Sequence, residues 1–269
     1  MNKINSFYPN LGMSWATIGV FFGCTFAIGM LIAALGMFSG NPDFTNNSWV
    51  TLVCYILPFI FTAGCIYFYQ YSEKTETAPV AKDIPVVIFP LLLIFVPLVS
   101  FLIEPLTAWL PVPDFVQKMF EGMFQNNLAT FLMVVIAASL CEEWLCRGVI
   151  TKGLLRHGSP LRAILWSAFI FAVIHMNPWQ AVPAFILGML LGYVYWKTRS
   201  LIPCIFIHFV NNGLSFLLMS IFPETDINAS TQDLIGNQYW TIYAAAFVVA
   251  IPLGYSLYKV LNKEKVIEE

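Results

Sequence analysis

Long apolar runs separated by short polar segments fill almost the whole chain. A membrane-spanning helix needs about 20 mostly apolar residues. Eight runs approach or exceed this length, at about 13–38, 49–71, 84–110, 128–150, 162–176, 180–197, 201–222 and 239–261. The fifth and sixth runs are short and almost touch at Asn177 and Pro178, so they form either two short spans or one broken element.

The apolar runs are continuous, whereas transmembrane β-strands show segments of about ten residues with alternating polarity. The pattern therefore predicts an all-α, polytopic membrane protein with about eight transmembrane helices. The first run is longer than the apolar part of a cleaved signal peptide, so we expect it to be retained as a helix. The polar segments are short, and we expect residues 1–269 to form a single integral-membrane domain.

Composition supports this interpretation and excludes other classes. The chain is 59% hydrophobic and 10% charged, with a mean hydropathy of +0.75. Soluble domains carry about 25% charged residues. The formal net charge of −2 gives no basic patch, so no nucleic-acid partner is expected. The six cysteines form no C-x-x-C pair and are expected to be reduced and buried.

The distribution of basic residues predicts the orientation. With eight spans and a cytoplasmic N-terminus, all of the thirteen Lys and Arg residues except Lys118 fall on the inner side. Inner loops of membrane proteins are enriched in these residues. The sequence thus predicts a cell-membrane protein with cytoplasmic N- and C-termini, in a bacterial inner membrane.

Three apolar runs contain polar residues, which are costly within a membrane and often functional. In the fourth run, Glu143 and Arg147 have i, i+4 spacing and can form an ion pair. Glu142 lies about 100° away around the helix and has no cation nearby in sequence, which leaves it available for chemistry. A structural alternative is that both glutamates mark a helix end.

The other two polar sites contain histidine. His175 ends the fifth run, with Phe171 one turn earlier on the same face. His208 and Asn212 share one face of the seventh run through i, i+4 spacing. Each could also be a buried structural residue. Helix rise places all three sites at depths where they can meet in one polar intramembrane cavity near the inner side.

This set of side chains suits hydrolysis. A carboxylate can take a proton from water, imidazoles can orient the water or hold a metal, and an amide can donate to an oxyanion. The sequence has no Gly-x-Ser-x-Gly motif for a serine nucleophile and no His-Glu-x-x-His zinc motif.

In order and spacing, the three segments resemble the CPBP intramembrane proteases, which include the CAAX prenyl endopeptidases and the bacterial Abi proteins. The family pattern is Glu-Glu-x-x-x-Arg, then Phe-x-x-x-His, then His-x-x-x-Asn or Asp. This sequence has Glu142-Glu143 with Arg147, Phe171 with His175, and His208 with Asn212. The family-like catalytic core covers about residues 128–220.

The resemblance implies an endopeptidase in which Glu142 and His175 activate water, and His208 and Asn212 stabilise the oxyanion or complete a metal site. Glu143, Arg147 and Phe171 would then support this site. A divalent metal such as zinc, held by the four catalytic residues, is an open alternative. Expected partners are membrane lipid and a lipid-associated peptide or a prenylated protein, and the oligomeric state stays open.

Two other functions remain open at this stage. The first is a non-enzymatic immunity or scaffold protein on the same fold, because fold alone does not fix function. The second is a proton-coupled transporter, since Glu and His also form proton relays within membranes. Transporters usually carry repeats in both halves, whereas the polar residues here cluster in one half.

Overall fold

The computed structural model describes residues 8–41, 43–73, 84–123, 125–222 and 230–263, and within these ranges all regular structure is helical. Among these described residues, seven helices are long and apolar enough to cross a membrane, which confirms the all-α, polytopic prediction. That residues 1–269 form one domain stays a prediction, as do the orientation of the chain and its bacterial origin.

The long helices match the apolar runs. Their bounds are α1 Leu11–Ser39, α2 Ser48–Glu73, α3 Ile88–Ile103, α9 Pro178–Thr198, α10 Ile202–Ile221 and α12 Tyr239–Asn262. The fourth run forms one long helix of consecutive segments: α5 Leu128–Phe131, η2 Leu132–Ala137, α6 Ala138–Glu143, η3 Trp144–Thr151 and α7 Lys152–His157. Shorter elements connect these: η1 Glu104–Leu106, α4 Asp114–Met123, α11 Thr231–Ile235 and η4 Gly236–Gln238.

The fifth run forms its own helix, α8 Pro160–Ile174, which settles one alternative left open by the sequence. Met176 has a φ of 55°, and Asn177 caps α9 by accepting from the backbone N–H of Gln180 at 2.9 Å. The chain therefore reverses between α8 and α9 and forms two separate helices. At 1.5 Å per residue α8 is about 22 Å long, shorter than a bilayer core.

Helices α8 and α9 pack closely because α9 carries small residues one turn apart. Gly188 and Gly192 form a G-x-x-x-G pair, the spacing that lets membrane helices approach each other. A Cβ built on Gly188 would lie 3.0 Å from the Cα of Ala168, and one on Gly192 would lie 3.2 Å from Ile164. This contact brings the Gly188 carbonyl and Phe171 beside the long helix.

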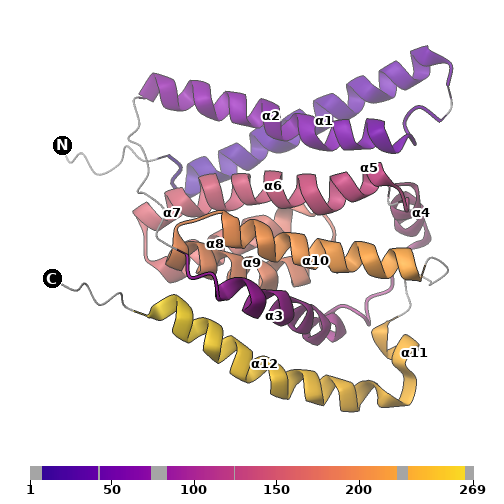
Figure 1. Ribbon diagram of the computed structural model, residues 1–269. Helices are drawn as coiled ribbons and strands as arrows, with labels where there is room; N and C mark the ends of the chain where they lie inside the picture. Colours follow the sequence, from indigo (N-terminus) through magenta and orange to yellow (C-terminus); the bar gives the residue numbers. More distant parts are fainter. Residues whose placement is uncertain (1–7, 42, 74–83, 124, 223–229, 264–269) are drawn as a thin grey trace.

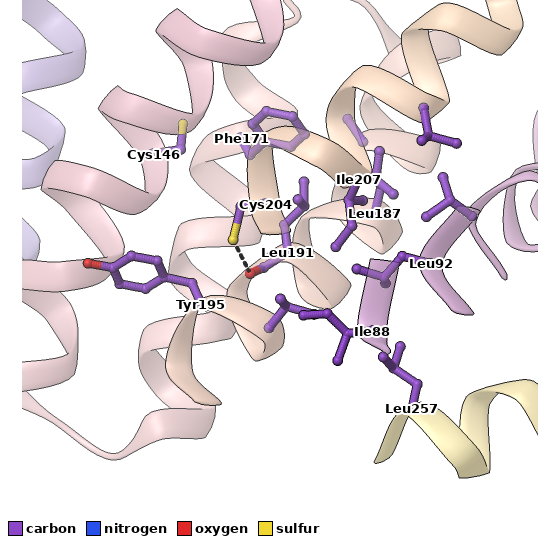
Figure 2. Packing of buried hydrophobic residues seen from close by; sticks show 14 residues of the cluster. Ile88, Leu92, Cys146, Phe171, Leu187, Leu191, Tyr195, Cys204, Ile207 and Leu257 are labelled. Atoms are coloured by element: carbon purple, nitrogen blue, oxygen red, sulfur yellow. Dashed lines mark hydrogen bonds between the residues drawn. The ribbon is translucent and has the colours of Figure 1, made fainter. Parts of the chain in front are cut away.

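The long helix 128–157 lies at the centre of the bundle. In Figure 1, α1 and α2 cross above it, while α8, α9, α10, α3 and α12 lie below. Half of its most apolar window is buried, a larger share than in any other candidate span. Figure 2 shows the cluster beneath it, where residues of α3, α9 and α10 such as Leu92, Leu191 and Ile207 interdigitate. A second cluster joins α1 and α2 to its upper face.

In Figure 1, α1 begins and α12 ends on the same side of the bundle, at the left. If the first spanning helix begins and the last one ends on the same side of the membrane, the chain crosses the membrane an even number of times. The seven long candidate spans together with the short α8 give this parity.

Candidate active site

Glu142 lies at the end of α6 with one carboxylate oxygen bonded and one free. The Tyr55 hydroxyl, on α2, donates a hydrogen bond of 2.6 Å to Glu142 Oε1. Glu142 Oε2 is buried and has no hydrogen-bond partner among the described residues. A carboxylate oxygen accepts hydrogen bonds through its lone pairs. Oε2 is therefore the atom of Glu142 that can bind a water molecule.

Glu143, the next residue, faces another direction and forms the ion pair expected from its spacing. Arg147 Nη1 lies 2.8 Å from Glu143 Oε1, and both side chains are fully buried. Arg147 Nη2 also donates to the Gly188 carbonyl of α9 at 3.2 Å. The guanidinium lies 4.3 Å above the ring of Phe171. These contacts tie the long helix to α8 and α9.

His208 reaches this ion pair from α10. Its Nδ1 lies 2.9 Å from Glu143 Oε1, the same oxygen that Arg147 binds. Because an ionised carboxylate only accepts, Nδ1 is the donor, and Nε2 stays available for substrate or water. The family resemblance implied only a supporting role for Glu143 in the catalytic site. The structure adds that Glu143 orients the His208 ring.

His175 is held by the end of its own helix. The last carbonyls of a helix lack backbone partners, and His175 Nδ1 lies 2.7 Å from one of them, the Phe171 carbonyl. A carbonyl only accepts, so Nδ1 carries the proton and Nε2 presents a lone pair. Both histidines thus have a fixed Nδ1 and an available Nε2.

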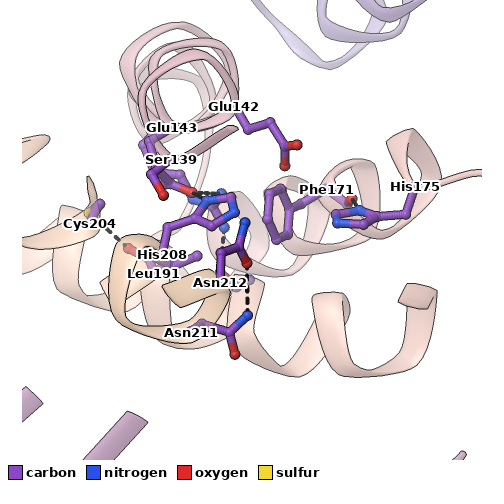
Figure 3. Close-up of polar contacts among 12 residues, drawn as sticks. Ser139, Glu142, Glu143, Phe171, His175, Leu191, Cys204, His208, Asn211 and Asn212 are labelled. Atoms are coloured by element: carbon purple, nitrogen blue, oxygen red, sulfur yellow. Dashed lines mark hydrogen bonds and ion pairs between the residues drawn. The ribbon is translucent and has the colours of Figure 1, made fainter. Parts of the chain in front are cut away.

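Phe171 lies between the two histidines. Its ring centroid is 5.0 Å from that of His175 and 5.6 Å from that of His208, both in edge-to-face geometry. In Figure 3 the Glu142 carboxylate points from α6 toward the space beside Phe171 and His175. The hydrogen bonds of the described residues do not join Glu142 directly to either histidine.

The Asn212 amide is oriented by a chain of hydrogen bonds. Its Nδ2 donates to the Val134 carbonyl at 2.8 Å, and its Oδ1 accepts from Asn211 at 3.0 Å. Asn211 in turn accepts from Ser100 of α3 at 2.8 Å. Val134 lies in the π-helical segment η2, a type of irregularity common at functional sites. The second N–H of Asn212 can donate to a substrate oxygen.

Figure 3 shows the four predicted catalytic residues in one close-up, on the long helix, at the end of α8 and on α10. The structure also adds residues that the sequence did not single out: Tyr55, Ser100 and Asn211. Tyr55 and Ser100 lie in apolar runs with no spacing signal. Asn211 carried a signal of another kind, because it is a second amide in an apolar span, directly before Asn212.

The donor set does not fit a three-ligand zinc site in this arrangement. Within the described residues, no three His, Cys, Asp or Glu side chains come together as a metal-binding group. Structural and catalytic zinc sites use at least three such protein ligands. Metal dependence stays a prediction.

Two pockets lie away from these residues. One is lined by Glu104, Trp109, Asp233 and Tyr239, among others. The other is lined by residues that include 46–49. The polar intramembrane cavity stays a prediction of the sequence.

Residues 124–214 match a protein-family model described as type II CAAX prenyl endopeptidase Rce1-like. No curated protein and no solved structure matches the chain. The matched segment contains the three motifs and all four predicted catalytic residues. The match confirms the resemblance to the CAAX protease family, which is a family of membrane proteases.

Proposed function

We propose that the protein is an intramembrane endopeptidase that hydrolyses a membrane-associated or lipidated peptide with a water molecule activated by Glu142. The observation that carries this proposal is the state of the Glu142 carboxylate. Tyr55 binds one of its oxygens, while the other is buried and has no partner among the described residues. A buried acceptor of this kind is costly unless it binds something, and water is the reactant that hydrolysis needs.

In this mechanism Glu142 Oε2 takes a proton from water as the water oxygen attacks the carbonyl carbon of the scissile peptide bond. His175 Nε2 accepts the second hydrogen bond of the same water and fixes its direction of attack. As the tetrahedral intermediate collapses, the carbon–nitrogen bond breaks. The proton held by Glu142 passes to the leaving amine, so that the carboxylate is regenerated.

His208 and Asn212 stabilise the carbonyl oxygen of the scissile bond, which becomes negatively charged in the tetrahedral intermediate. The Asn212 N–H and, when the ring is protonated, the His208 Nε2–H donate to the carbonyl oxygen of the scissile bond. Their orientation is set in advance by Glu143 and by the Val134 carbonyl with Asn211. Donors that are already oriented need no reorganisation during the reaction, which is the basis of oxyanion stabilisation.

The substrate class can be tested with matched peptides. Glu142, His208 and Asn212 lie on helices that qualify as membrane spans, and His175 follows the shorter apolar helix α8. A substrate anchored in the lipid therefore reaches the site at a higher local concentration. We expect a peptide with a farnesyl or acyl chain to be cleaved in liposomes at least about tenfold faster than the same peptide without it, since each buried CH₂ contributes about 0.8 kcal/mol to membrane binding. Quantifying both products by mass spectrometry measures this ratio. Equal rates for the two peptides would contradict the proposed substrate class.

A chelator tests the role of metal. Because the described side chains do not form a three-ligand group, we expect cleavage by the purified protein to continue after incubation with EDTA or phenanthroline and desalting. The control is addition of zinc to the treated protein. Loss of activity on chelation and its recovery with zinc would contradict the water activation proposed here and favour a metal site.

A further inference from the structure

Tyr55 contributes a hydroxyl to the candidate site from outside the segment that matches the protease family. It lies on α2, whereas the family match begins at residue 124. Its hydrogen bond to Glu142 joins residues 87 positions apart in the chain. Tyr55 is the donor in this hydrogen bond, and the carboxylate oxygen of Glu142 accepts.

Aromatic packing holds Tyr55 in place. Its ring centroid lies 5.5 Å from that of Phe59, and Phe59 lies 4.7 Å from Phe21 of α1. The ring also packs against the cluster that joins α1 and α2 to the long helix. The hydroxyl is therefore presented by a constrained side chain. A hydroxyl within an apolar bundle is costly unless it is bonded, and Glu142 supplies the partner.

The hydrogen bond from Tyr55 gives the two carboxylate oxygens of Glu142 different roles. Oε1 is engaged by Tyr55, and Oε2, the buried atom without a partner among the described residues, remains for water. Fixing one oxygen fixes the plane of the carboxylate and so the direction in which Oε2 points. Without this bond the carboxylate can rotate about its terminal torsion, which has a broad energy profile.

We propose that Tyr55 is a positioning residue for the reaction, and that it orients Glu142 so that Oε2 faces the attacking water. The inference rests on the proposed peptidase function. It also assigns a role to the N-terminal helix pair α1–α2, which carries none of the family motifs: docking of α2 on the long helix completes the site (Figure 1).

Replacement of Tyr55 by phenylalanine tests this role, because only the hydroxyl is lost. A hydrogen bond to a charged group corresponds to about a ten- to hundredfold effect, and we expect Tyr55→Phe to lower kcat by this factor with KM unchanged. Tyr243→Phe is the matched control. Its hydroxyl donates to the Leu102 carbonyl at 2.8 Å, between α12 and α3, and its removal should leave kcat and KM at wild-type values.

A double variant shows whether Tyr55 acts through Glu142. In a Glu142→Gln protein the base is absent, so adding Tyr55→Phe should leave the residual cleavage rate unchanged. Wild-type kcat in Tyr55→Phe, or a decrease of equal size in the Glu142→Gln background, would overturn the positioning role. A wild-type protein that is folded but cleaves none of the lipidated peptides would instead overturn the proposed function, and this inference with it.

Discussion

Replacement of Glu142 by glutamine is expected to lower kcat by about 10²- to 10⁴-fold, the contribution of a general base. Glutamine keeps the size of the side chain and an oxygen that can accept from Tyr55. It replaces the carboxylate with an amide, so no group at this position takes a proton from water. Steady-state kinetics on a lipid-anchored peptide measures the effect, and KM should change little because the base acts mainly in the transition state.

Glu104→Gln is the matched control for this change. Glu104 is a partly buried glutamate whose Oε1 accepts a hydrogen bond of 2.6 Å from the Thr231 backbone N–H, near the end of α3. The same substitution there should leave kcat at the wild-type value. If Glu142→Gln retains wild-type kcat while remaining folded, Glu142 is not the base.

Replacement of Arg147 by methionine is expected to destabilise the protein by about 3–5 kcal/mol, the effect of removing one partner from a buried ion pair. The substitution leaves Glu143 fully buried without its cation and removes the hydrogen bond to Gly188. It also removes the charge above the Phe171 ring. Thermal unfolding in detergent measures the loss as a lower midpoint temperature.

Two further variants separate the ion pair from general effects of losing an arginine. Arg162→Met changes an exposed arginine at the start of α8 and should shift the unfolding midpoint little. Adding Glu143→Gln to Arg147→Met removes the unpaired charge and should recover part of the lost stability. An unfolding midpoint of Arg147→Met equal to that of wild type would show that the buried pair does not support the fold.

Much of the fold could be predicted from the sequence because the bilayer imposes a length and a polarity on each helix. The apolar run 201–222 and helix α10 Ile202–Ile221 agree closely. The fourth apolar run ends near residue 150, whereas the helix that contains it continues to His157. The last turns of this helix contain Lys152 and Arg156. Because these residues are charged, a count of apolar residues ends before them.

Local spacing predicted the parts of the site that lie on a single helix. The Glu143–Arg147 ion pair and the shared face of Phe171 and His175 both follow from helical geometry. The link between His208 and Glu143 could not be predicted, because it depends on how α10 is rotated against the long helix.

Tyr55 was missed for a similar reason. It is one of several tyrosines in its run, and only the docking of α2 selects it as the partner of Glu142. The hydrogen bond from Asn212 to the Val134 carbonyl of η2 could not be predicted either, because it joins residues 78 positions apart.

The most direct test is cleavage of one lipid-anchored peptide by purified protein in H₂¹⁸O, followed by mass spectrometry of the fragments. Wild-type protein and Glu104→Gln are expected to give two fragments, with ¹⁸O in the newly formed carboxylate, while Glu142→Gln gives almost none. Intact peptide after incubation with folded wild-type protein would contradict the central claim that the protein is a peptidase. It would favour the non-enzymatic scaffold that the sequence left open.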